Sequence, residues 1–196
     1  KLQKNSWVGI GKKDNEKNHL EIFKNISSTQ FCGYETTACN SKLLYIIKND
    51  MLVDSTKKNE EVILIFDKTP FYAEAGGQLG DSGKILNSNK QTVAEVSHTK
   101  KINNGIYLHF VNKCLFELKK NELYVLEIDI YKRNKTSNNH SATHLLHESL
   151  RQIVGKHVSQ KGSLVSSKKL RFDYSSNEQL SLEKQKKIEN LVNYSI

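Results

Sequence analysis

The stretch RNKTSNNHSATHLLHESLRQIVGKHVSQKGSLVSSKKLRFDY, which runs from Arg133 to Tyr174, decides the fold of this chain. Between Ser137 and Val154 its apolar residues recur at helical spacing, and Gly155 stands where a left-handed residue would end a helix. The runs HVSQKGSLV and KKLRFDYS then flank a polar turn at residues 166–168, which predicts two strands. The stretch therefore predicts a helix followed by a strand pair.

The residues upstream carry a β-like pattern from about Thr37 to Ile130. Short runs rich in β-branched and aromatic residues alternate with clusters of Asn, Asp, Gly and Lys, and five or more such strands predict a barrel or a sandwich. In the last run Leu126, Ile128 and Ile130 share one face, so this strand is predicted to be half buried. The predicted strands are Leu43–Ile47, Glu61–Phe66, Thr92–Ser97, Ile106–Val111 and Leu123–Ile130.

Downstream, Ser181 precedes a lysine-rich segment with acidic Glu183 in its first turn, which predicts a capped helix. Its apolar stripe consists of Leu182, Ile188, Leu191 and Val192. This helix has no stop signal before Ile196, which we interpret as truncation. The sequence thus predicts an α+β chain in three parts: residues 1–30 as the tail of a preceding helical domain, residues 31–131 as a β-barrel-like subdomain with a glycine-rich loop, and residues 132–196 as a truncated α/β subdomain.

The composition restricts the class of protein. Hydrophobic residues make up 37% and charged residues 26%, and no apolar run approaches the roughly 20 residues of a membrane-spanning helix. The net charge of +9 suits a polyanionic partner, although lysine is spread over the whole chain and marks no single face. Residues 1–11 lack the apolar core of a secretory signal, and Cys32, Cys39 and Cys114 are widely scattered, which together predict the reducing cytoplasm and no disulfide framework.

Two histidines form the first candidate site. His140 and His144 lie four residues apart on the predicted helix, so both imidazoles project from one face and can reach a single zinc ion. Two ligands are half a zinc site, and two ordinary surface or core histidines are the alternative. His147 is predicted to be structural, because it lies roughly 10 Å along the axis from His140. The sequence gives no role to His109 or His157.

The second candidate site is the stretch TPFYAEAGGQLGDSG, from Thr69 to Gly83. Gly76 and Gly77 permit backbone conformations that other residues avoid, and Gln78 offers both a donor and an acceptor. Such a loop could hold a small polar group. A tight β-turn beside a strand is the alternative interpretation.

Four elements in order resemble the editing domain of alanyl-tRNA synthetases: the glycine-rich loop from Thr69, HSATHLLH, HVSQKGSLV and LRFDY. The resemblance is strong from Thr69 to the end, moderate over residues 31–68 and slight before that. It implies a β-barrel-like subdomain carrying the loop, an α/β subdomain carrying the histidines, and zinc held by His140 and His144. The remaining cysteine and histidine ligands are expected beyond Ile196, and residues 1–30 would end a tRNA-binding domain.

The resemblance also implies a reaction. The whole enzyme would attach alanine to tRNA(Ala) with ATP and magnesium in a domain outside this chain, and this segment would hydrolyse Ser-tRNA(Ala) and Gly-tRNA(Ala) with zinc. By the same resemblance Gln160 and Gln78 are candidate catalytic residues, and the substrate-binding candidates are Gly76, Gly77, Lys161 and Arg171. The isolated segment is predicted to bind zinc weakly and to be nearly inactive.

The resemblance implies tRNA(Ala) as the partner, and neither a membrane nor DNA is expected. Oligomerisation could occur through a C-terminal region that this chain lacks. Two alternatives stay open. One is a free-standing editing deacylase of the same superfamily, or the related domain of threonyl-tRNA synthetase, and the other is a non-catalytic RNA-binding module.

Overall fold

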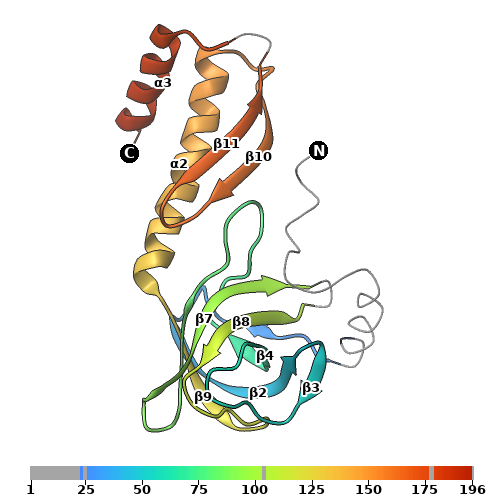
Figure 1. The fold of residues 1–196 in the computed structure, drawn as a ribbon. Helices are drawn as coiled ribbons and strands as arrows, with labels where there is room; N and C mark the ends of the chain where they lie inside the picture. The colour runs from blue at the N-terminus through green and yellow to red at the C-terminus, as the bar shows by residue number, and fades with distance from the viewer. Residues whose placement is uncertain (1–22, 24–25, 103–104, 177–178, 196) are drawn as a thin grey trace. The chain divides into compact units, whose positions relative to one another are not determined.

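The computed structural model describes residues 23, 26–102, 105–176 and 179–195 (Figure 1). Contacts within the chain divide it into two compact units. The barrel unit comprises Lys1–Ala73 and Ser82–Ile128, and the helical unit comprises Glu74–Asp81 and Asp129–Ile196. The α+β class with a barrel-like subdomain, predicted from the sequence, is confirmed. The glycine-rich loop was expected in the barrel subdomain, but residues 74–81 group with the helical unit instead.

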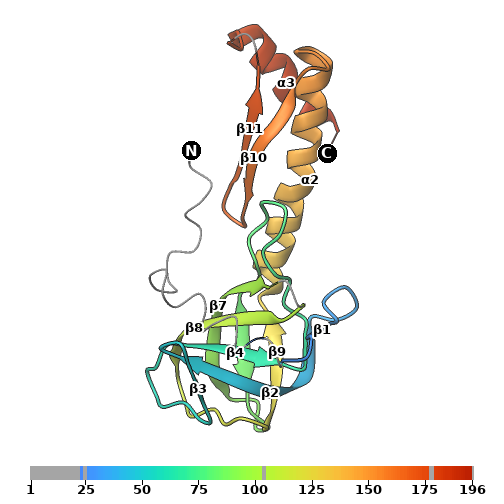
Figure 2. The ribbon, with the colours of Figure 1, turned by 90° about the vertical axis from the view of Figure 1, so that its right-hand side faces the viewer.

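Six antiparallel strands of the barrel unit form a closed sheet in the order β2, β4, β8, β7, β6, β9, and β9 pairs again with β2 (Figures 1 and 2). Strand β2 closes the ring because it is long enough to bond two partners. Its residues 38–42 pair with β9, and its residues 43–47 pair with β4. The bounds are Ala38–Lys48 for β2, Val62–Phe66 for β4, Gly83–Leu86 for β6, Thr92–Lys101 for β7, Tyr107–Cys114 for β8 and Leu123–Ile128 for β9.

Three short strands complete the barrel unit. β1 (Gln30–Phe31) pairs in parallel with β5 (Lys68–Thr69), and β3 (Met51–Val53) forms a hairpin with the end of β2. All five strands expected from the sequence are present, but β6 was missed. It has four residues, and of these only Ile85 is buried, so no local pattern marks it. Its ladders with β7 and β9 make it a strand.

The barrel interior is filled by the apolar side of each strand, with Leu43, Leu64, Phe66, Ile85 and Leu126 completely buried. Each such side chain contributes roughly 1.5–3 kcal/mol by leaving water. A second cluster joins Ile26 to Ile47, Ile65, Ile106 and Leu108.

Ile26 is buried in this cluster, and residues 26–30 group with the barrel unit. The other residues of the predicted tail, 1–22 and 24–25, lie outside the described part of the chain.

His109 is a core residue of the barrel. Its ring is fully buried between Phe66 and Phe71, whose centroids lie 5.3 and 5.4 Å away. Its Nδ1 lies 3.1 Å from the carbonyl oxygen of Leu64, which can only accept, so Nδ1 carries the proton. Nε2 therefore accepts from the Thr69 hydroxyl at 2.7 Å. Burial lowers the pKa of His109 from 6.5 to about 4, because the charged ring would lose its hydration.

The barrel is expected to lose stability as the pH falls from about 6.5 to about 4. Over this range the unfolded chain binds a proton at His109 and the folded chain does not, so protonation favours unfolding, by about 3 kcal/mol at the acid end. Urea unfolding as a function of pH measures the loss. His109→Gln should remove about one proton from the pH dependence. Identical profiles for His109→Gln and the wild type would contradict the assignment.

The helical unit consists of helix α2 (Ile130–Ile153), the antiparallel hairpin of β10 (Ser159–Val165) and β11 (Leu170–Ser175), and helix α3 (Leu182–Tyr194). The predicted end of α2 is confirmed, since Val154 is its C-cap and Gly155 follows with a φ of 138°. The predicted start at Ser137 was wrong, because the helix begins at Ile130. The first turns are polar on most sides and carry no helical apolar pattern.

Asp129 decides where the helix begins. Its carboxylate accepts a hydrogen bond from the backbone N–H of Lys132 at 3.0 Å, as an N-cap residue does. The strand predicted to reach Ile130 therefore ends at Ile128, which is buried, while Ile130 is 47% exposed. The predicted half-buried face is confirmed for Leu126 and Ile128 only.

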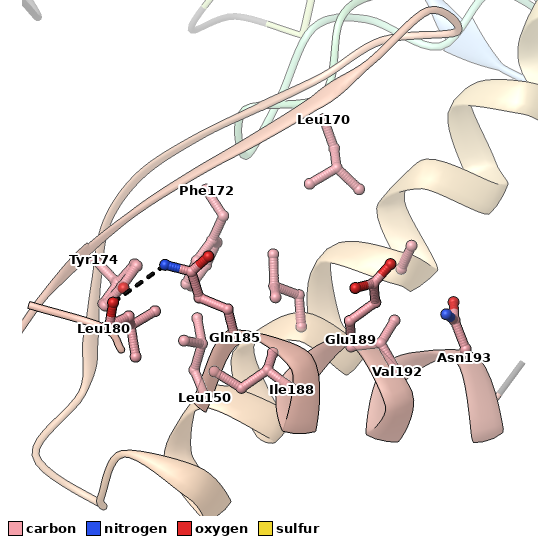
Figure 3. Close-up of a pocket in the computed structure, with 12 residues that line it drawn as sticks. Leu150, Leu170, Phe172, Tyr174, Leu180, Gln185, Ile188, Glu189, Val192 and Asn193 are labelled. Carbon is pink, nitrogen blue, oxygen red and sulfur yellow. Dashed lines mark hydrogen bonds between the residues drawn. The ribbon is translucent and has the colours of Figure 1, made fainter. Parts of the chain in front are cut away.

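The two helices and β11 enclose an apolar groove of about 380 Å³ (Figure 3). Leu150 and Ile188 line it and are buried, and Val158 joins them in one hydrophobic cluster. Ser181 caps α3 by accepting from the N–H of Lys184, as predicted. The prediction that Leu182 belongs to the apolar stripe of α3 is wrong. Its side chain is 78% exposed, because it lies in the first turn of the helix, away from this core. No helix in the described ranges is long and apolar enough to cross a membrane.

Candidate functional site

Helix α2 places the two candidate ligands side by side. The imidazole rings of His140 and His144 are 5.0 Å apart between centroids and tilted by only 19°. His140 is half-buried and His144 is exposed, so the pair borders solvent and is not sealed inside the unit. The helical spacing produces this arrangement directly, since residues four apart lie one turn above each other.

The glycine-rich loop forms a two-residue hairpin turn. The N–H of Gln78 donates to the oxygen of Ala75 at 2.9 Å, and the N–H of Ala75 donates back to Gln78 at 3.1 Å. Between them Gly76 and Gly77 have φ values of 58° and 84°. Two successive positive φ angles are the geometry of a type I′ turn, which side chains disfavour. The tight β-turn considered from the sequence is therefore present.

The turn is bonded to strand β10. The N–H of Val165 donates to Gly77 at 2.8 Å, and the N–H of Leu79 donates to Val165 at 2.9 Å. A Cβ on Gly77 would lie 2.2 Å from the hydroxyl oxygen of Ser163, so only glycine allows this approach. These bonds explain why the loop groups with the helical unit.

The loop brings Gln78 against the first histidine. The Oε1 atom of Gln78, a residue only 8% exposed, lies 2.5 Å from Nδ1 of His140. An amide oxygen only accepts, so Nδ1 must donate and carries the ring proton. The lone pair of His140 is then on Nε2. This is the tautomer and the type of support that histidine ligands of metals have in proteins, with the second ring nitrogen bonded to an oxygen.

An ion pair that the sequence analysis missed ties the loop to α2. The Arg133 guanidinium donates from Nε to both oxygens of Asp81, at 3.0 and 2.8 Å, and a further short contact joins Nη2 to Oδ2. Both side chains are largely buried, at 18% and 7% exposure. Asn139 adds a bond from Nδ2 to the oxygen of Ser166 at 2.7 Å. No spacing in the sequence signals either contact, because the partners come from separate segments.

The remaining predicted site residues lie on the hairpin. Gln160 is exposed and precedes Val165 by five positions, which corresponds to roughly 16 Å along a strand, so the structure does not bring it together with Gln78. Lys161 is exposed at a bulge between the pairs that Gln160 and Gly162 make. Arg171 is exposed and forms an ion pair with Asp173 at 3.0 Å.

The donor set can be compared with the needs of zinc. A structural or catalytic zinc ion takes three or four protein ligands, and His140 and His144 supply two nitrogens. Within residues 23, 26–102, 105–176 and 179–195, no three His, Cys, Asp or Glu side chains gather around one point. The pair therefore fits zinc as half of a ligand set. His147 does not add to it, because its ring packs on Phe172 at 5.1 Å and its Nε2 is buried without a partner in the described residues.

Comparisons with known proteins identify the family. The sequence model described as tRNA synthetases class II (A) matches residues 2–131, two thirds of the chain. This chain belongs to the class II (A) tRNA synthetases. The match begins at residue 2, so it includes the region where the motif resemblance is slight.

Several alanine–tRNA ligases are similar to this chain. The ligase of Fusobacterium nucleatum is 46% identical over 90% of this chain, that of Petrotoga mobilis 41% over 93%, and that of Wolbachia pipientis 40% over 95%. The chain spans about a fifth of their length, from 19% to 21%. It is thus similar to one section of a much longer synthetase.

Proposed function

We propose that this segment is the editing region of an alanine–tRNA ligase and hydrolyses Ser-tRNA(Ala) and Gly-tRNA(Ala) with zinc. The whole protein would attach alanine to tRNA(Ala) with ATP and magnesium outside this segment. Such an enzyme needs correction, because a pocket that accepts a methyl group cannot exclude glycine and rejects an added hydroxyl by only about a hundredfold. A second, hydrolytic site supplies the missing discrimination.

The hydrogen bond from His140 to Gln78 carries the proposal. It holds the ring in the tautomer with Nε2 unprotonated, and the ring of His144 lies parallel beside it, so two imidazoles are available to one cation. Zinc held there would supply Lewis-acid chemistry that polarises the ester or activates water. Its other two ligands would be a cysteine and a histidine outside this segment. Gln78 acts in this proposal as the residue that positions His140.

The other residues would bind the substrate. The backbone at Gly76 is exposed, with open space where a side chain would be, so the aminoacyl group could approach the turn closely there, while Gly77 holds the turn against Ser163. Lys161 and Arg171 are exposed cations on the hairpin and suit the phosphates of the acceptor end. Gln160 lies on the same hairpin, where its amide could bond to the sugar or the base of the acceptor end.

Metal removal tests the proposal. Deacylation of Ser-tRNA(Ala) by the full-length synthetase should fall to background after treatment with a chelator, return on addition of zinc, and leave ester hydrolysis of correctly charged tRNA low throughout. An unchanged rate in metal-free protein would overturn the role of zinc, whereas a rate at background in the zinc-loaded protein would overturn the deacylase activity and favour the RNA-binding module. The free-standing deacylase receives less support, since the similar relatives are whole ligases.

A further inference from the structure

An aromatic cluster lies on the barrel unit, far in sequence from His140 and His144. The ring of Phe31 stacks on Tyr107 with centroids 5.6 Å apart and an angle of 4°, and meets Tyr34 edge-on at 5.0 Å and Tyr72 at 6.3 Å. We call these four residues the aromatic platform. Tyr107 is buried, Phe31 and Tyr72 are half-buried, and Tyr34 is 86% exposed. The platform therefore ends in a ring that faces solvent.

The backbone holds Tyr34 in a tight turn. The N–H groups of Glu35 and Thr36 both donate to the oxygen of Cys32 at 3.1 Å. Cys32 itself donates to the oxygen of Thr69 at 2.9 Å, which continues the pairing of β1 with β5. Gly33 is required at this turn, because a Cβ there would lie 2.2 Å from the oxygen of Pro70. The backbone that carries the exposed side chain of Tyr34 is thus held in a defined turn.

Two lysines belong to the strands that carry these rings or pair with them. Lys101 pairs across the strands with Tyr107, and its Nζ lies 5.7 Å from the centre of that ring. Lys68 pairs with Gln30, the residue before Phe31. Lys101 is exposed, so its charge is available to a ligand. Exposed aromatic rings beside cations are the combination by which proteins bind unpaired nucleotides, since a base stacks on the ring and phosphates lie near the lysines.

We propose that the aromatic platform binds single-stranded RNA, with one base stacked on Tyr34 and a neighbouring phosphate beside Lys101. A duplex does not fit this mode, because its bases are already stacked and only unpaired bases offer a free face. The surface belongs to the barrel unit alone and uses neither the histidines nor zinc. It holds whether or not the helical unit hydrolyses an ester.

The experiment measures binding of a fluorescein-labelled single-stranded RNA of about ten nucleotides by fluorescence anisotropy. It uses metal-free full-length protein in which the hairpin cations are also removed by Lys161→Ala and Arg171→Ala, so that the proposed editing site contributes little. Tyr34→Ala should weaken binding at least about fivefold, while Tyr34→Phe keeps the affinity. Lys101→Ala should lower the dependence of affinity on salt by about 0.7 in the double-logarithmic slope, as expected for one phosphate.

Two controls separate stacking from a general loss. Tyr194→Ala removes another tyrosine, 91% exposed on α3, and should not change the affinity. An oligonucleotide with abasic sugars should bind wild type and Tyr34→Ala equally, because it has no base to stack. Equal affinity of Tyr34→Ala and wild type for the intact RNA would overturn the proposal. So would equal weakening by Tyr34→Phe, which would assign the effect to the hydroxyl group.

Discussion

Replacing His140 and His144 by alanine in the full-length synthetase is expected to lower hydrolysis of Ser-tRNA(Ala) at least about a hundredfold. Their parallel rings, 5.0 Å apart, are the proposed half of a zinc site, and the Lewis-acid contribution of a metal amounts to several kcal/mol of barrier. Zinc content should fall together with the rate, whereas attachment of alanine should continue. Deacylation assays and elemental analysis on one preparation measure both effects.

The control is His157→Ala, which removes an exposed histidine from the loop that follows α2. Gln78→Ala provides a graded comparison. It leaves both imidazoles in place but removes the acceptor that lies 2.5 Å from Nδ1 of His140, and loss of such a support typically costs ten- to a hundredfold in metal affinity or activity. Full zinc content and full activity in the double histidine variant would show that the pair is not a metal site.

Arg133→Ala is expected to destabilise the helical unit by about 3–5 kcal/mol. The substitution leaves the Asp81 carboxylate, whose side chain is 7% exposed, without the guanidinium that donates to both of its oxygens. A largely buried charge that loses its bidentate guanidinium partner costs far more than a lost surface ion pair. Urea unfolding followed by circular dichroism measures the loss, and hydrogen exchange at the N–H of Leu79 reports release of the loop from β10.

Arg151→Ala is the matched control, because Arg151 is exposed in the last turn of the same helix. This substitution should change the free energy of unfolding by less than about 0.5 kcal/mol. Combining Arg133→Met with Asp81→Leu removes both charges and should recover much of the stability. The ion pair has no structural importance if Arg133→Ala unfolds at the same urea concentration as Arg151→Ala.

The candidate site was predictable only in part. The pairing of His140 with His144 follows from helical spacing, which is a local rule, and the turn at Gly76 and Gly77 follows from the residue type. The bond from Gln78 to His140 joins positions 62 apart in sequence, and no composition or period indicates it. The ion pair of Asp81 with Arg133 joins positions 52 apart in sequence, and no local pattern indicates it either. The contact with His140 adds to the predicted catalytic role of Gln78 a proposed role in positioning that histidine.

By itself the sequence determined the α+β class, five of the barrel strands, the end of α2, the hairpin and the cap of α3, because alternation, helical period and capping chemistry act over a few residues. The start of α2 depends on the local cap that Asp129 provides to Lys132, which the apolar pattern does not mark. Tertiary structure alone decided that β6 is a strand and that the glycine-rich loop packs with the helical unit. Both depend on hydrogen bonds between segments far apart in the chain. Such bonds form only once both partners are in place, and so they leave no pattern in the local sequence.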